Sequence, residues 1–350
     1  MLAVLGCGAP PRPATDDAAY AQAERALSQG DLSLAQTHFE ALAAGTQDPE
    51  RSALYRYRLA TIARRAGRGA EAERLFAEVA AGDSTERAPL ADYQQAVAAF
   101  EAGQGDGALR ALALAHPDSV AADKAVKFLA THVQAPDHAA QIVAWLEDLA
   151  ARHPQAAVAD NALWWAAEVR LFHQDDLPGA RTTLRHLART HPESPLTDDA
   201  IWRLGQLYLR QGAWTQAAET LGALLEIRNE TSYFVGSYRS PYLDDAALLI
   251  ARIRHHGLRD PAGAVLAFEA MLADFPTSVL VDDALLGLAQ ARFAAGQERL
   301  GRAALQQLVN DHPQSRHAEG ARALLQAPRP PATDFDEALL APEPWAPVRP

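Results

Sequence analysis

The feature that most constrains this chain is a short apolar pattern that returns at nearly constant intervals. Each copy places a small or apolar residue, another apolar residue four positions on, and a further one three positions later. This is the spacing of one buried helix face. The steps between successive copies are 37, 36, 34, 38, 37, 47 and 37 residues, which indicates a stack of repeats, each contributing one such helix. The copies begin at Ala35, Ala72, Ala108, Ile142, Ala180, Ala217, Ala264 and Gly301.

A second pattern marks the start of the helix that precedes each of these. It is an acidic residue two positions before an Ala, with a Ser four positions before the acid in all copies but one. A Ser at this place caps the helix, and the acid sits at the positive end of the helix dipole. Seven residues after the acid comes a small residue that lets paired helices approach closely. The acids are Asp123, Asp160, Asp198, Asp244, Asp282 and Glu319, and the small residues are Ala130, Ala167, Gly205, Ala251 and Ala289.

Helix ends are marked by proline, in most copies after a histidine. A helix stops before a Pro, and a His in the last turn suits the negative end of the dipole. Together the signals predict paired helices at 16–29 and 32–44, 50–66 and 69–81, 87–102 and 105–115, 119–134 and 137–152, 157–173 and 177–190, 195–210 and 213–227, 241–256 and 260–274, 279–295 and 298–311, and a last helix at 316–326.

The pattern is clearest at 194–224, where two amphipathic helices meet at a turn. Leu204-Gly205-x-x-Tyr208, followed by Ala217-x-x-x-Leu221, resembles a tetratricopeptide repeat. The resemblance implies an all-α fold: a right-handed superhelical solenoid of about eight helix-turn-helix repeats over 16–326, closed by a C-terminal capping helix.

Two stretches break the period. The 47-residue step hides an extra loop at about 229–240 that carries Tyr233, Phe234 and Tyr238. Loops that interrupt a regular scaffold often make contacts, so these aromatics are candidate contact residues, and folding over a helix edge is the other interpretation. The tail, 327–350, is Pro-rich and without periodicity, and we expect it to be disordered or polyproline-like.

The first fifteen residues suggest a membrane anchor. Val4-Leu5-Gly6-Cys7 resembles a lipobox, in which the Cys is lipidated, and the Pro-rich stretch to residue 15 would act as a tether. Only six residues precede Cys7, and none is basic. Two interpretations stay open: a lipoprotein signal whose true start lies upstream, or the frayed end of a cytoplasmic protein.

Composition and motifs argue against several function classes. The 32 basic residues against 44 acidic ones give a net charge of −12, which argues against nucleic-acid binding. The sequence contains no GxSxG, HExxH, P-loop or glycine-rich dinucleotide motif. Paired carboxylates such as Asp198-Asp199 recur at one helix-start position, so they are interpreted as structural. No catalytic residue, cofactor or metal site is predicted.

The resemblance places the functional surface on the first helices, which line the concave groove of tetratricopeptide arrays. Two tryptophans at equivalent positions of adjacent repeats, Trp164 and Trp202, would be aromatic anchors for a bound peptide. Packing of both against neighbouring helices is the alternative. The groove residues that the resemblance implies are Lys127, Trp164, Glu168, Trp202, Gln206, Arg252 and Gln290.

These observations predict a non-enzymatic scaffold that binds a protein or peptide segment. The repeats together with the lipobox resemble tetratricopeptide lipoproteins of the Gram-negative outer membrane. That resemblance implies a lipid-anchored protein on the periplasmic face of the outer membrane, acting in cell-envelope assembly or maintenance. The alternatives are a superhelical partner or cut-down relative of a soluble lytic transglycosylase, and a cytoplasmic adaptor.

Overall fold

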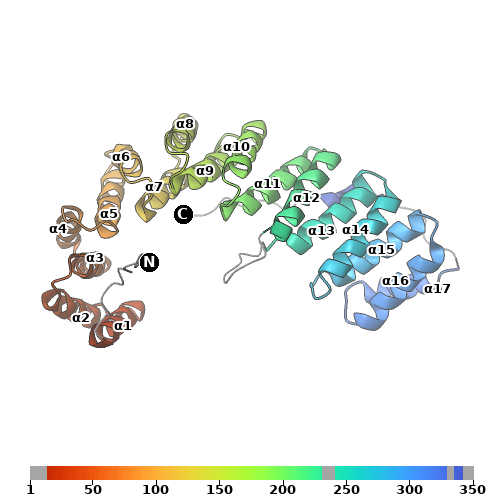
Figure 1. The fold of residues 1–350 in the computed structure, drawn as a ribbon, viewed down its shortest axis with the longest axis horizontal. Helices are drawn as coiled ribbons and strands as arrows, with labels where there is room; N and C mark the ends of the chain where they lie inside the picture. The colour runs from red at the N-terminus through yellow and green to blue at the C-terminus, as the bar shows by residue number, and fades with distance from the viewer. Residues whose placement is uncertain (1–13, 231–240, 329–334, 342–350) are drawn as a thin grey trace, which may run out of the picture. The chain divides into compact units, whose positions relative to one another are not determined.

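The computed structural model describes residues 14–230, 241–328 and 335–341. Within these ranges the chain forms seventeen α-helices, one π-helix and one 3-10 helix, and no β-strand (Figure 1). The all-α prediction is therefore confirmed, with eight helix pairs and a final single helix. None of the described helices is both long enough and apolar enough to cross a bilayer. Cys7, Tyr233, Phe234 and Tyr238 lie outside the described residues.

The backbone divides into two compact units, which are described separately. Residues up to 133 and 145–162 belong to unit 1, and residues 134–144 and 163–349 to unit 2, so that α8 and α9 contribute to both. The helices up to that point are α1 Ala14–Ser28, α2 Leu32–Gly45, α3 Pro49–Arg65, α4 Gly69–Ala80, α5 Arg87–Glu101, α6 Gly107–Ala115, α7 Val120–Thr131, α8 Pro136–Arg152 and α9 Val158–His173. Those that follow are α10 Leu177–Thr190, α11 Leu196–Arg210, α12 Trp214–Glu230, α13 Leu243–Arg252, η1 Ile253–Gly257, α14 Pro261–Asp274, α15 Val281–Ala294, α16 Glu298–Asp311, α17 Ala318–Gln326 and η2 Glu337–Leu340.

The close helix–helix approach expected at Gly205 is present between α11 and α12. A Cβ at this position would lie 2.5 Å from Cδ2 of Leu221, whose side chain is fully buried. The other small residues at the equivalent position, including Ala167 and Ala251, are buried as well. The His-Pro signals also end helices as predicted, since His191 and His312 are the C-cap residues of α10 and α16.

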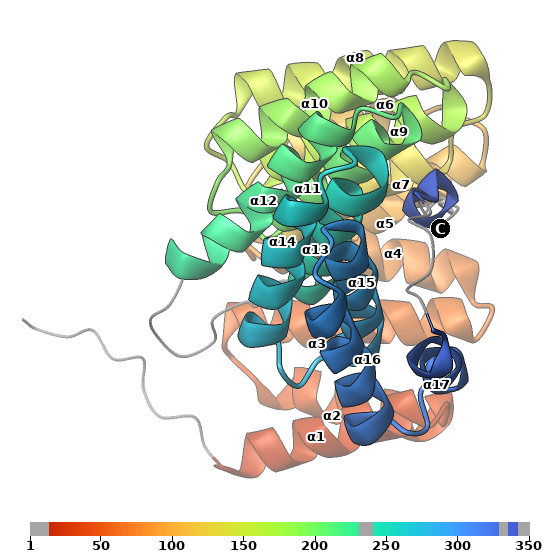
Figure 2. The same ribbon diagram turned by 90° about the vertical axis from the view of Figure 1, so that its right-hand side faces the viewer.

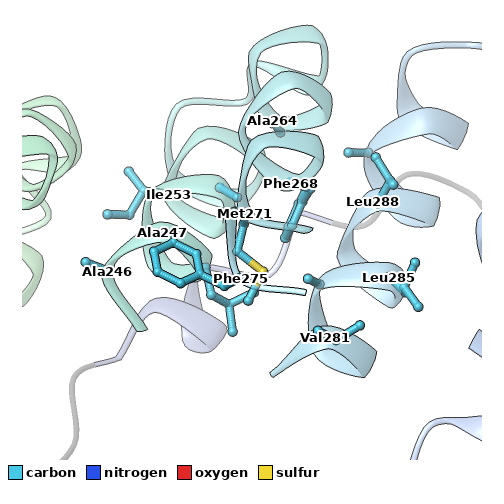
Figure 3. Packing of buried hydrophobic residues seen from close by; sticks show 14 of the residues in the cluster. Ala246, Ala247, Ile253, Ala264, Phe268, Met271, Phe275, Val281, Leu285 and Leu288 are labelled. Atoms are coloured by element: carbon cyan, nitrogen blue, oxygen red, sulfur yellow. The ribbon is translucent and has the colours of Figure 1, made fainter. Parts of the chain in front are cut away.

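The core of unit 2 runs between consecutive helices, each packed on the next. Phe268 and Met271 of α14 fill the space between α13 and α15 (Figure 3). Phe268 packs closely against α15 because residue 287 is Gly. A Cβ at that position would clash with the Phe268 ring. First helices of successive repeats also meet directly, as α13 and α15 do (Figure 2). This places their side chains on one shared face.

Successive repeats are also joined by hydrogen bonds that the sequence pattern did not predict. The Ser278 hydroxyl accepts from the Leu280 N–H just before α15, but the N-cap residue of that helix is Leu280, so the predicted capping role of Ser278 is wrong. The same hydroxyl also donates to the Asp244 carboxylate of the preceding repeat, 2.6 Å away. Ser315 makes the same 2.6 Å bond to Asp282. At these two repeat boundaries the Ser of one repeat is therefore bonded to the acid of the repeat before it.

Two predictions of local structure were wrong. The helix expected to run regularly over 241–256 ends with a π-helical turn, in which the Leu258 N–H donates to the Ile253 carbonyl at 2.9 Å. The tail expected to be disordered contains a folded segment, 335–341, whose Leu340 is 1% exposed. Burial of one leucine offsets the conformational entropy that is lost when such a short turn becomes ordered. The composition of the tail does not reveal that the rest of the protein has a site where this leucine can be buried.

Candidate functional site

The first helices α11, α13 and α15 of unit 2 surround a cavity of about 450 Å³. Its lining combines stacked aromatic rings, leucines, two arginines and two aspartates. We call it the first-helix cavity. It is lined by Trp202, Gln206, Leu209, Tyr242, Asp245, Leu248, Leu249, Arg252, Leu280, Asp283, Arg316, Leu339, Leu340 and Ala341.

One wall of the first-helix cavity is a stacked pair of rings. Trp202 of α11 and Tyr242, just before α13, lie with centroids 5.0 Å apart and planes 4° from parallel. The Tyr242 hydroxyl donates to Oδ1 of Asp199 at 2.7 Å, which fixes the ring. Burial raises the pKa of Asp199, and the bond from Tyr242 opposes that shift. The pair is thus held rigid on one side and offers a flat apolar surface on the other.

The opposite end of the cavity is polar. Asp283 accepts from Arg252 at 2.7 Å, from Arg316 at 2.9 and 3.1 Å, and lies 3.3 Å from Nε2 of His317. Two guanidinium groups share this single carboxylate, so each keeps donors for another acceptor. The Arg316 side chain is 73% exposed, so its guanidinium group is accessible to a ligand.

Trp164 and Glu168 belong to a separate cluster on α9 and α11. The Arg203 guanidinium lies over the Trp164 ring, 5.7 Å from its centroid, and 3.3 Å from the Glu168 carboxylate. Glu168 is only 4% exposed, so its prediction as a groove contact is wrong. Burial raises its pKa, Arg203 counteracts the shift, and Asp199 adds to it. The Glu168 side chain is directed toward α11, the first helix of the next repeat, because Arg203 on that helix supplies the opposite charge.

The other predicted groove residues divide between the two units. Gln206 and Arg252 line the first-helix cavity together with Trp202. Gln290 is half-buried on α15 and is not among the lining residues. Lys127 is exposed on α7 of unit 1. Three of the seven predicted residues therefore meet at one site.

The described residues contain one grouping with metal-ligand types, formed by Asp282, Asp283 and His317 within 4.8 Å. Asp283 is already paired with two arginines, and Asp282 accepts from Ser315. Both carboxylates already accept hydrogen bonds and the Asp283 charge is paired with arginine, so the cluster gives no support to a cation site.

Two parts of the cavity escaped sequence reasoning. Tyr242 stands at the end of the loop that breaks the period, where its stacking on a first helix of the preceding repeat has no sequence signature. The wall formed by Leu339, Leu340 and Ala341 comes from the Pro-rich tail. The only sequence signal for it was the run Phe335–Leu340, a short segment without proline that combines one aromatic residue, two acidic residues and two leucines.

Comparison with known proteins supports the repeat assignment. Residues 199–227 and 283–315 match the family model of the tetratricopeptide repeat. No curated protein matches the sequence. Solved structures that resemble the chain include nearly identical TPR-like repeats of a proposed kinesin light chain from Podosopora anserina, with 15% identity and a TM-score of 0.36 over 55% of this chain and 95% of that one.

A tetratricopeptide repeat protein from Parabacteroides merdae has 13% identity and a TM-score of 0.30, over 90% of this chain and 98% of that one. The P58(IPK) TPR domain has 15% identity and a TM-score of 0.27, over 89% and 99%. At such low scores we draw neither function nor partner from these structures.

The paired helices and the cavity on their first-helix face define an all-α helical-repeat protein. The two matched segments, residues 199–227 and 283–315, are similar to tetratricopeptide repeats. The predicted resemblance to tetratricopeptide repeats is thereby confirmed for these two segments, and the predicted resemblance to outer-membrane lipoproteins stays a prediction.

Proposed function

We propose that this protein is a non-enzymatic scaffold that holds a peptide segment of a partner protein in the first-helix cavity. The observation that carries the proposal is the rigid Trp202–Tyr242 stack facing the paired guanidinium groups of Arg252 and Arg316. Large, pre-fixed aromatic surfaces beside charge-assisted donors are typical of binding hot spots. A ligand there buries apolar side chains on the rings and offers an acceptor to the arginines.

The test is a selection of displayed random peptides against the full-length protein, with affinities measured by titration. We expect Arg316→Ala to weaken the selected peptides about tenfold or more, because it removes an exposed donor at the cavity. Arg299→Ala is the matched control, since Arg299 is an exposed arginine of the second helix α16. Peptides that bind both variants like wild type, or a selection that yields none, would overturn the proposal.

We further propose that the scaffold is lipid-anchored through Cys7 on the periplasmic face of the outer membrane and acts in cell-envelope assembly or maintenance. Support comes from the sequence Val4-Leu5-Gly6-Cys7 and the Pro-rich tether after it. Gly rather than Asp follows the Cys, which suits sorting to the outer membrane. Partition of the protein between detergent and water, described in the Discussion, tests the anchor.

A further inference from the structure

The last described segment of the chain, residues 335–341, is seated against the first-helix cavity. It forms one helical turn, Glu337–Leu340, capped by Asp336, whose Oδ1 accepts from the Ala338 N–H at 2.9 Å. Leu340 is 1% exposed, whereas its neighbour Leu339 is half-exposed and lines the cavity. A short helical turn that buries one leucine in a cavity wall binds in the way a peptide ligand does, although it belongs to the same chain.

The start of the segment is held by two histidines of the π-helical turn. The backbone N–H of Asp336 donates to Nδ1 of His256 at 3.2 Å. The Phe335 ring packs on His255, with centroids 5.4 Å apart. Burial, followed by the neighbouring His256, lowers the pKa of His255 to about 4, so this ring is neutral at pH 7 and suits an apolar contact.

Charge complementarity adds to these contacts. The Arg259 guanidinium lies over the Phe335 ring, 5.7 Å from its centroid. The same guanidinium is 3.9 Å from the Glu337 carboxylate. Both groups are well exposed, so the ion pair contributes little energy, but it favours an acidic residue at this point of the segment.

The seat of Leu340 depends on a glycine. A Cβ at position 257 would lie 3.1 Å from Cδ1 of Leu340 and 2.8 Å from Cγ of Trp214. The absence of a side chain at Gly257 therefore leaves space beside the π-helical turn, and the Trp214 ring and the end of the Leu340 side chain occupy it together. The same leucine also lines the first-helix cavity with Trp202 and Tyr242.

We propose that residues 335–341 are an internal ligand of the groove and that the partner carries a segment of the same chemistry, which displaces them. That segment is a capped helical turn: an aromatic residue, one or two acidic residues, then paired leucines three and four positions after the first acid. The inference rests on the proposed function, because it names the class of peptide that the first-helix cavity accepts.

Covalent attachment makes the internal segment a strong competitor. The segment belongs to the same chain as the cavity, and covalent attachment of this kind gives an effective concentration on the order of millimolar. A partner peptide must outcompete that local concentration. Unseating the segment should therefore raise the apparent affinity of a free peptide by about tenfold or more.

The test uses a fluorescent peptide with the sequence of residues 333–343 and three full-length proteins: wild type, Leu340→Asp and the control Leu266→Asp. Leu266 is 69% exposed on the second helix α14. We expect the peptide to bind Leu340→Asp at least tenfold more tightly than the other two, and the peptide carrying the same Leu-to-Asp change not to bind. Equal binding to all three proteins, or no binding to Leu340→Asp, would overturn the inference. Should circular dichroism show that Leu340→Asp is unfolded, Phe335→Asp replaces it.

Failure of this inference can be told from failure of the proposed function. Peptides selected from the random library on Leu340→Asp should contain the acid-to-paired-leucine spacing and compete with the fluorescent peptide. Selected peptides of other sequence that bind wild type and Leu340→Asp equally, and still lose affinity in Arg316→Ala, would leave the peptide-binding function standing and refute the internal ligand. A selection without any binder on either protein would refute both.

Discussion

Replacing Gly205 with Ala should destabilise the protein, although the same change elsewhere in a helix stabilises. The added Cβ would lie 2.5 and 2.7 Å from Cδ2 and Cγ of Leu221, and no buried leucine accommodates a carbon at that distance without moving. Leu221 is fully buried between α11 and α12, so a shift of its side chain has to displace other core atoms. Gly222 on α12 is the matched control, since a Cβ there meets nothing within 4 Å.

The magnitude follows from two opposing terms. A Gly→Ala change in a helix interior gains about 1 kcal/mol of helix propensity. Overpacking a tight contact costs about 1–3 kcal/mol. Gly222→Ala should therefore stabilise by about 1 kcal/mol and Gly205→Ala should destabilise by up to about 2 kcal/mol. The difference between the two variants, about 1–3 kcal/mol, is the overpacking cost itself.

Urea denaturation followed by circular dichroism measures both variants. A double-mutant cycle assigns the cause: Leu221→Ala costs about 2–5 kcal/mol in the parent and should cost at least about 1 kcal/mol less in the Gly205→Ala background. Equal stabilisation by Gly205→Ala and Gly222→Ala would refute the packing of α11 on α12 described above. An additive cycle would show that the strain lies elsewhere.

Three further predictions concern other parts of the chain. Burial, aided by the charge of Asp160, raises the pKa of Asp123 to about 6. Its charged form is therefore costly in the folded state, a penalty that grows from about pH 4 and is complete above pH 6. Asp123→Asn should accordingly stabilise by about 1–2 kcal/mol at pH 7.5 and not at pH 4, and a gain that does not depend on pH would contradict this origin. Ser278→Ala should cost about 1–2 kcal/mol by removing the donor to Asp244, and a melt identical to the parent would show that the bond between repeats contributes nothing. Finally, a lipidated protein should partition into the detergent phase and Cys7→Ser should release it, whereas equal partition of both would remove the lipoprotein interpretation.

The repeat architecture was predictable because short sequence patterns that determine each helix pair recur along the chain. The apolar face around Ala217 and Leu221, the small residue at Gly205 and the His-Pro helix ends each reflect nearest-neighbour packing, which depends on sequence a few residues away. Helix positions followed from these signals to within a few residues. The domain limits that we predicted from the sequence stay a prediction.

The site was predictable only where it follows the repeat register. Trp202, Gln206 and Arg252 lie on the first-helix face because the period puts them there. Glu168 occupies the same repeat position as Gln206 and Arg252, but its carboxylate pairs with Arg203 on the neighbouring helix. The tail reaches the cavity through contacts about 80 residues apart in sequence, such as Asp336 with His256, and no local pattern encodes such a pairing.

The central claim, that the first-helix cavity holds a peptide on its aromatic wall, is tested most directly by Trp202→Ala. One measurement decides it: the affinity of a library-selected peptide for the variant, corrected for the fraction folded in a parallel thermal melt. Trp202 is only half-buried, so we predict a folded protein whose affinity falls by about 2 kcal/mol, roughly thirtyfold. A variant destabilised by about 3–5 kcal/mol with unchanged affinity per folded molecule would contradict the account and show that the indole is part of the core alone.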